Sequence, residues 1–243
     1  DLVKTYGPLV HLKTTGEHLY VVTDPRHVRD VLVTHQRKFK KGRGLERSKG
    51  LLGNGLLTAE GQDHLRQRRL LQPAFHKERI TTYAAAMTHY AQRTSARWTP
   101  GVTLDVDAEM MQLTLGIVGK TLFDTDVEGK TRDVGEAMAA IMNSFWLRMV
   151  PFASSLEKLP IPALKRAKEA GELLDRLVYE MIAERRKDPR DRGDLLSMLI
   201  LAQDEENNGR GMTDKQVRDE AITIFLAGHE TTANALAWTW YLL

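Results

Sequence analysis

The sequence predicts a single, mainly α-helical domain with a small β region near the amino terminus. Apolar residues recur at helical spacing from Lys77 to the end of the chain, which is the pattern of amphipathic helices. Two short runs typical of β-strands stand before residue 23. No internal repeat and no linker composition divides residues 1–243, so we expect one domain.

Composition and charge exclude several classes of protein. The chain has 243 residues, of which 42% are hydrophobic and 28% charged, as in ordinary globular domains. Its net charge of +3, from 35 basic and 32 acidic residues, is too small to argue for nucleic acid binding. No signal peptide and no run of 18 apolar residues is found, so we expect a cytoplasmic chain without a membrane span. Cysteine is absent, which excludes disulfides and any thiolate ligand within these residues.

The first part of the chain is expected to form a β-hairpin, a helix and a long loop. Residues 9–12 and 18–22 are the two strands of the predicted hairpin. Asp24 then suits the N-cap of a helix, and Pro25 suits its first position. Residues 38–60 are basic and rich in glycine, which indicates a loop with a short helix near residues 45–52.

The rest of the chain is expected to be helical. Helices are predicted over residues 77–98, 108–123 with Asp107 as the cap, 133–149, 163–187 and 194–203. A polar loop is expected over residues 204–211. Prolines at 151, 160 and 162 mark a connector between the third and fourth of these helices.

The final helix, from Thr213 to Leu243, is the longest predicted element. Thr213 and Gln216 form a capping box, and no proline follows them. At 1.5 Å per residue the helix is roughly 45 Å long, enough to cross a whole domain. Its apolar stripe consists of Val217, Ala221, Ile224, Phe225 and Gly228.

The middle of this helix, residues 227–232, departs from the helical pattern with the sequence Ala-Gly-His-Glu-Thr-Thr. Glycine costs about 1 kcal/mol relative to alanine inside a helix. The hydroxyl of Thr231 can bond back to the carbonyl of Ala227, and an acid beside a hydroxyl can relay protons. A zinc-protease motif is excluded, because it requires histidine where Ala233 stands. The plainer alternative is a core helix with one glycine packing contact.

A second candidate site lies in residues 63–75. His64 and Arg68 are four residues apart and therefore share one helix face. A cation and a hydrogen-bond donor one turn apart suit a carboxylate ligand. For Arg66 and Arg69 a solvated basic face is the alternative.

The two motifs together resemble the cytochrome P450 heme-thiolate monooxygenases. The Ala-Gly-His-Glu-Thr-Thr segment resembles their oxygen-binding helix, and Pro73-Ala74-Phe75 resembles the end of the helix that holds the heme propionates. The resemblance covers essentially the whole chain but about half of a complete family member. It implies a cytochrome P450 fold that is incomplete on its carboxy-terminal side, with the iron-binding cysteine beyond the final helix.

The resemblance also implies roles for individual residues. It makes Glu230 and Thr231 the proton path and leaves room for dioxygen at Ala227 and Gly228. It assigns heme contacts to His64, Arg68 and Phe75, and a substrate pocket to Leu56, Leu57 and Ile224.

The implied activity is the insertion of one oxygen atom of O₂ into a small apolar organic substrate. The implied cofactor is heme b, and the implied electron donor is a ferredoxin or a flavoprotein reductase. A basic cluster of Arg43, Arg47, Arg66 and Arg69 is expected to attract such a donor.

Two other functions stay open at this point. The chain lacks the iron ligand, so one alternative is a truncated, non-catalytic helical protein that binds a hydrophobic ligand or a partner. The other is a heme carrier that uses His64 as the iron ligand.

Overall fold

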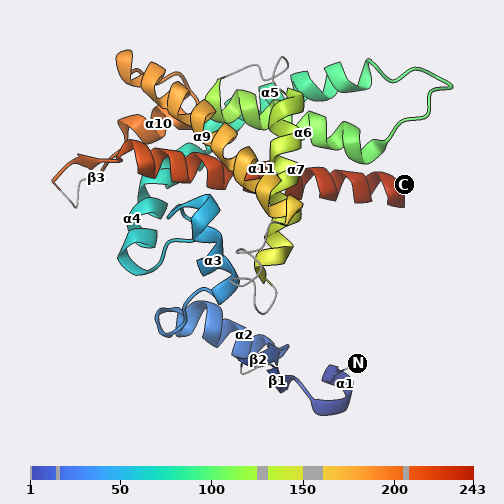
Figure 1. Cartoon of the computed structure of the whole chain (residues 1–243), viewed down its shortest axis with the longest axis vertical. Coiled ribbons are helices and arrows are strands. Elements are labelled where there is room, and N and C mark those ends of the chain that lie inside the picture. The colour runs from blue at the N-terminus through green and yellow to red at the C-terminus, as the bar shows by residue number, and fades with distance from the viewer. Residues whose placement is uncertain (1, 15–16, 125–130, 150–160, 205–207) are drawn as a thin grey trace.

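A computed structural model describes residues 2–14, 17–124, 131–149, 161–204 and 208–243. The chain forms a helical body and a smaller amino-terminal lobe, which lie at opposite ends of the longest axis (Figure 1). The predicted class, mainly α with a small β region at the amino terminus, is confirmed. None of the described helices is both long and apolar enough to cross a membrane.

The amino-terminal lobe holds the predicted hairpin. Helix α1 (Leu2–Tyr6) precedes strands β1 (Leu9–Thr14) and β2 (Glu17–Val22), which pair antiparallel with Leu9 opposite Val22. Helix α2 (Pro25–Arg29) follows, and its chain continues through a π-helical turn over Asp30–Thr34 and a 3-10 turn over Gln36–Lys38. The side chain of Asp24 accepts a hydrogen bond from the backbone N–H of Arg26, which confirms the predicted N-cap.

The first helices of the body are α3 (Arg43–Leu52), α4 (Gly61–Leu71) with a 3-10 turn over Gln72–Phe75, α5 (Lys77–Ser95) and α6 (Val106–Phe123). The prediction that Asp107 caps α6 was wrong. Asp105 is the N-cap, because its side chain accepts a hydrogen bond from the N–H of Ala108 over 3.2 Å. Asp107 lies in the first turn, where a negative charge stabilises the helix by its interaction with the helix dipole.

The next elements are α7 (Thr131–Met149), α9 (Pro162–Lys187), α10 (Leu195–Leu201), β3 (Gln203–Asp204) and β4 (Arg210–Gly211). The polar loop predicted for residues 204–211 is framed by the short antiparallel pair β3–β4. Arg66 of α4 holds this pair, since its guanidinium donates to the carboxylate of Asp204 over 2.9 Å and to the carbonyl of Gly211 over 3.2 Å. The connector predicted at residues 151–160 lies outside the described residues.

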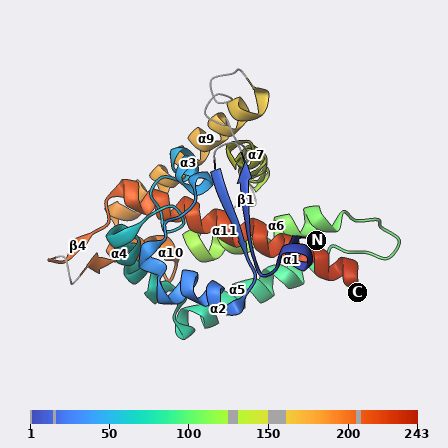
Figure 2. The ribbon, with the colours of Figure 1, turned by 90° about the horizontal axis from the view of Figure 1, so that it is seen from below.

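Helix α11 (Asp214–Leu242) is the long helix that the sequence predicts, and both bonds of its capping box are present. It runs through the middle of the helical body with α6 and α9 packed against it (Figure 1, Figure 2). Val217, Ala221 and Phe225 are buried in the main core, as the predicted stripe requires. After its first turn the long helix is buried on all faces, since residues 217–223 are all buried, and exposed positions follow in the second half, from Ala227 onward.

Candidate functional site

One stripe of α11 connects the core to the predicted oxygen site. Glu220, Ile224, Ala227 and Thr231 follow one another at intervals of four, three and four residues, so they share a helix face. Glu220 is fully buried, Ile224 is half-buried, and Ala227 and Thr231 are exposed. The stripe is about 16 Å long at 1.5 Å per residue. It therefore leads from the interior to an open surface.

The hydroxyl of Thr231 donates a hydrogen bond to the carbonyl oxygen of Ala227, one turn earlier. The sequence predicts this bond, and α11 continues through it without interruption to Leu242. The bond uses the hydroxyl hydrogen and leaves the oxygen of Thr231 able to accept hydrogen bonds. An exposed acceptor is thus held in a fixed position on the helix surface.

Glu230 lies on a different face of α11 from Thr231. It lines a cavity of about 500 Å³ between α6, α7 and α11, together with Asp107 of α6. One carboxylate oxygen, Oε2, is buried there without a hydrogen-bond partner. Burial raises the pKa of Glu230, and the neighbouring charge of Asp107 raises it further. The carboxyl group of Glu230 therefore ionises at a higher pH than that of an exposed glutamate.

Gly228 and His229 fix α11 against α6. A Cβ atom at Gly228 would lie 3.3 Å from Cγ2 of Val118, so a glycine allows the two helices to approach closely. The ring nitrogen Nε2 of His229 is 3.1 Å from the carbonyl oxygen of Met111 on α6, and burial lowers the pKa of this histidine. The close contact with Val118 explains why a glycine suits position 228. The role of Gly228 in making room for dioxygen stays a prediction.

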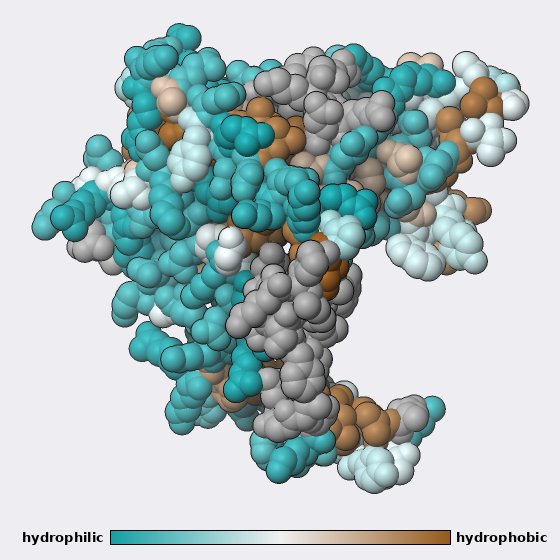
Figure 3. Space-filling view, viewed as in Figure 1, coloured by the Kyte–Doolittle hydropathy of each residue, from teal (hydrophilic) through white to brown (hydrophobic). Residues whose placement is uncertain are grey.

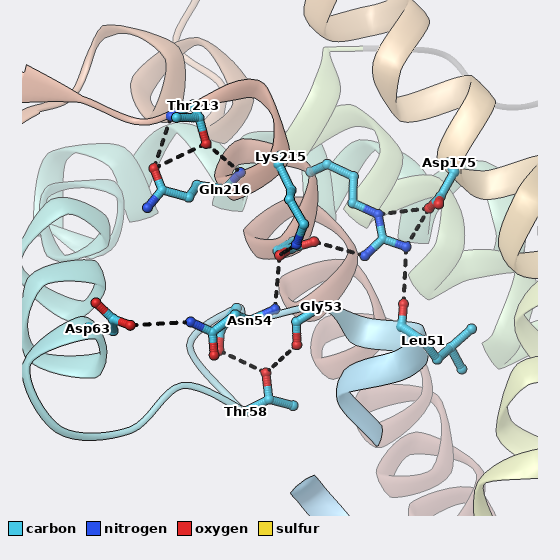
Figure 4. A network of polar contacts seen from close by, with 12 residues as sticks. Leu51, Gly53, Asn54, Thr58, Asp63, Asp175, Thr213, Lys215 and Gln216 are labelled. Atoms are coloured by element: carbon cyan, nitrogen blue, oxygen red, sulfur yellow. Dashed lines mark hydrogen bonds and ion pairs between the residues drawn. The ribbon is translucent and has the colours of Figure 1, made fainter. Parts of the chain in front are cut away.

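The loop of residues 53–59 is bound to α11 by two neighbouring carboxylates. The N–H of Asn54 donates to Oδ2 of Asp219, and the N–H of Leu56 donates to Oε2 of Glu220, each over 2.9 Å. Figure 4 shows the Asn54 end of this contact, beside the ion pairs of α11. The loop that carries Leu56 and Leu57 is therefore attached to the same helix as Ile224.

Asp219 belongs to a buried charge network. Arg218 donates to Oδ1 of Asp219 over 2.9 Å, to Asp175 of α9, and to the carbonyl of Leu51 over 3.0 Å (Figure 4). Lys215 donates to Oδ2 of Asp219 over 3.0 Å. A buried carboxylate is costly unless it is paired, and these two cations supply the pairing for Asp219.

Two glycines allow the loop to come this close. A Cβ atom at Gly53 would lie 2.0 Å from the carboxylate of Asp219, and the φ angle of +71° at this residue favours glycine. A Cβ atom at Gly55 would lie 2.3 Å from the hydroxyl of Thr223. The loop backbone thus lies directly on α11.

The second predicted motif lies on α4 beside this loop. His64 is half-buried and Arg68 is exposed. Burial lowers the pKa of His64, and the positive charges of Lys41 and Arg68 lower it further. The side-chain amide of Gln67 donates to the carbonyl of Asn54 over 2.6 Å, so α4 is attached to the loop as well. The helix that carries His64 and Arg68 is therefore attached to the loop through Gln67.

Two large apolar side chains of this region are exposed. Leu57 is 43% exposed and Phe75 is 54% exposed, whereas Leu56 packs partly against the main core. In the view of Figure 1 the molecular surface is hollowed between the amino-terminal lobe and the carboxy-terminal half of α11 (Figure 3).

Comparison with known proteins identifies the family. The model of the cytochrome P450 family matches residues 1–243. The chain belongs to the cytochrome P450 family. Cyclooctatin synthase of Streptomyces melanosporofaciens is 38% identical to it over 98% of this chain and 52% of that protein. The cyclooctat-9-en-7-ol 5-monooxygenase of the same organism is 37% identical, again over 98% of this chain and 52% of that protein.

Two further matches agree with this assignment. Pentalenene oxygenase of Streptomyces avermitilis is 35% identical over 99% of this chain and 53% of that protein. The solved structure of retinoic acid-bound cyanobacterial CYP120A1 has the same fold, with a TM-score of 0.82 over 97% of this chain and 52% of that chain, at 20% identity. This cytochrome P450 chain thus spans about half the length of the curated relatives it matches.

The side chains present fit a heme, the cofactor that the cytochrome P450 family implies. His64 and Arg68 project from one face of α4 and suit the two carboxylates of a heme edge. The exposed side chains of Leu57 and Phe75 suit contact with a flat apolar ring. Ala227 on α11 adds a small exposed residue that permits close approach.

Sequence reasoning missed the residues that hold the loop, namely Lys41, Asp219 and Glu220. The three consecutive charged residues 218–220 stand inside the apolar part of α11, and all three are buried. The sequence signal for this contact was the run of charged residues in an apolar helix, together with Gly53 and Gly55 in the loop. Their pairing could not be found, because Leu56 and Glu220 are 164 residues apart in the sequence.

The stability of the protein is expected to depend on pH through Glu220. Burial raises the pKa of Glu220 from 4.5 to about 7; the charge of Asp219 adds to this, while the bond from Leu56 and the charge of Lys41 oppose it. The native state therefore holds this proton more tightly than the unfolded chain. Its contribution to stability is complete below pH 4.5 and is lost as the pH rises through about 7.

Glu220→Gln keeps a neutral side chain at all these pH values. We expect the variant to match the unmodified protein in thermal unfolding at about pH 4, and to be more stable at pH 8 by up to about 3 kcal/mol. Thermal unfolding of the complete protein over this range measures the difference. Parallel pH profiles for the two proteins would contradict the assignment.

Proposed function

We propose that the complete protein is a heme-thiolate monooxygenase that inserts one oxygen atom of O₂ into a terpene-like, apolar substrate. The observation that carries the proposal is the exposed Thr231 hydroxyl, held by the carbonyl of Ala227 in the segment that resembles the oxygen-binding helix of the family. The printed names of two relatives, cyclooctat-9-en-7-ol 5-monooxygenase and pentalenene oxygenase, support the substrate class. Leu56, Leu57 and Ile224 would form part of the pocket.

Bound heme b would supply the oxygen activation, and the protein would supply binding and orientation. His64 and Arg68 would hold the heme carboxylates, and Phe75 would contact the ring. The chain contains no cysteine, so the axial thiolate of the proposed enzyme comes from outside residues 1–243.

Arg68→Ala tests the proposed heme contact. Loss of a charge-assisted bond should speed transfer of heme from the complete protein to an acceptor apoprotein by about tenfold. Arg69→Ala is the matched control on the same helix, because Arg69 lies 3.6 Å from the carboxylate of Asp204. Equal transfer rates for the two variants would argue against the assignment.

Glu230 and Thr231 would divide the handling of protons between two faces of α11. Glu230 would take up protons from the cavity, where burial raises the pKa of its carboxyl group. The oxygen of Thr231 would accept a hydrogen bond from water on the exposed face. Because the two side chains lie on different faces, water must complete the connection between them.

An electron donor with an acidic surface is part of the proposal. Arg66 is removed from the expected basic cluster, since it is bound to Asp204 and to the carbonyls of β4. Arg69 of α4 also forms an ion pair with Asp204, over 3.6 Å, so Arg43 and Arg47 of α3 are the members of the cluster that this carboxylate does not bind. We expect the rate of reduction by a ferredoxin to fall at least roughly tenfold from low to high salt. A rate independent of ionic strength would contradict this donor class.

Turnover under isotopically labelled dioxygen tests the proposed reaction. A panel of terpene hydrocarbons and alcohols is offered to the complete, heme-loaded protein with an electron donor. Mass spectrometry should find a product that carries one labelled oxygen atom. Heme-free protein that binds these compounds without oxidising them would instead support the non-catalytic binding alternative.

A further inference from the structure

We propose that Asp219 and Glu220 form a clasp that positions Leu56 and Leu57, and thereby sets which ligands fit the heme-facing pocket. The clasp consists of these two carboxylates and the backbone N–H groups of Asn54 and Leu56. The inference rests on the proposed function, because it makes the loop one wall of the pocket. It assigns to Glu220 the part of a positioning residue.

In the clasp, two consecutive carboxylates of α11 accept hydrogen bonds from two backbone N–H groups that are two residues apart in the loop. The N–H groups of residues 54 and 56 point to the same side of the loop and reach consecutive side chains of α11, each over 2.9 Å. Asp219 is 3% exposed and Glu220 is fully buried. Bonds of this kind, from a backbone N–H to a buried carboxylate, are among the stronger hydrogen bonds in proteins.

Stability alone does not account for Glu220. Asp219 is paired with Arg218 and Lys215, whereas Oε1 of Glu220 is buried without any hydrogen-bond partner. An apolar side chain would occupy this core position without the cost of removing a carboxylate from water. The carboxylate of Glu220 differs from an apolar side chain in that it accepts the hydrogen bond from Leu56, and this bond positions the loop.

The loop is held from its other side as well. Lys41 donates from Nζ to the carbonyls of Leu56 and Ala59, over 2.9 and 2.6 Å. Both backbone polar groups of Leu56 are therefore bound, one to α11 and one to Lys41. Because both groups of Leu56 are bound, the backbone that leads into Leu57 is held in place as well.

The clasp is also aligned with the proposed reaction site. Glu220 lies one turn before Ile224 on the stripe of α11 that continues to Ala227 and Thr231. A movement of the loop relative to Glu220 is thus a movement of Leu57 relative to that stripe. Such a movement should change the affinity for ligands that extend from the heme toward the loop, and leave the affinity for small ligands unchanged.

Azole binding to the complete, heme-loaded protein tests the proposal. The probes are imidazole and a carbon-substituted phenylimidazole, which bind iron through the same kind of nitrogen but differ in reach. Their dissociation constants come from the shift of the heme absorption band. Glu220→Ala should weaken phenylimidazole binding about tenfold and imidazole binding less than about twofold. Glu220→Gln, which keeps an acceptor oxygen for Leu56, should restore the affinity for phenylimidazole.

Lys41→Met releases the loop without a change in α11 and should give the same selective loss. Loss of imidazole binding in Glu220→Ala would show that this variant does not fold. In that case Lys41→Met alone tests the clasp. Equal weakening of both azoles in Lys41→Met, or unchanged phenylimidazole binding in either folded variant, would overturn the clasp. If the unmodified protein shows no band shift with either azole, the proposed heme function itself fails, and the clasp falls with it.

Discussion

Replacement of Arg185 by methionine is expected to lower the free energy of unfolding by about 3–5 kcal/mol. Arg185 is 7% exposed, and its guanidinium donates to Asp194, to the hydroxyl of Ser197 over 2.6 Å and to the carbonyl of Phe123 over 2.7 Å. Asp194 is 2% exposed and caps α10. The variant would leave this carboxylate buried without its cation, at the junction of α6, α9 and α10.

Arg186→Met is the matched control for this experiment. Arg186 is the next residue of α9, and its ion pair with Asp214 is largely exposed, with side-chain exposures of 38% and 56%. Exposed pairs contribute about 1 kcal/mol or less. Thermal or urea unfolding of the complete protein compares the two variants. A similar, small loss for both would show that the Arg185 network does not hold the three helices together.

Thr231→Ala is expected to separate electron use from product formation in the complete enzyme. The variant keeps the helix but removes the exposed oxygen that accepts a hydrogen bond from water. Electrons should then leave as hydrogen peroxide, and the fraction recovered in product should fall roughly tenfold or more. Parallel assays of electron donor consumption, peroxide and product measure the effect.

Thr239→Ala provides a closely matched control on the same helix. The hydroxyl of Thr239 donates to the carbonyl of Ala235 over 2.8 Å, which is the same bond that Thr231 makes with Ala227. Thr239 is also exposed, but it lies two turns farther along α11. We expect unchanged coupling in this variant. Fully coupled turnover in Thr231→Ala would exclude the proposed role of its hydroxyl.

The parts of the fold that depend on near neighbours could be predicted from the sequence. The capping box of Thr213 and Gln216 and the cap of Asp24 involve residues two or three positions apart, and both are present. The bond from Thr231 to Ala227 follows from helical spacing alone. The shared face of His64 and Arg68 follows in the same way.

The parts that depend on distant neighbours could not be predicted. One local prediction was also wrong: Asp105 and not Asp107 caps α6, because two aspartates two residues apart give the same local signal. Arg66 was expected on a basic surface, but its partner Asp204 is 138 residues away in the sequence. The bond between Glu220 and Leu56 has the same character. These contacts position the site, and residue spacing carries no information about them.

The absorption spectrum of the reduced, carbon monoxide-bound complete protein tests the central claim most directly. A heme-thiolate enzyme should show the heme band at the long wavelength that is typical of thiolate ligation, with one heme per chain. A band typical of histidine ligation, as a carrier using His64 would give, would contradict the account. Absence of any heme band from protein that was folded in the presence of heme would contradict it as well.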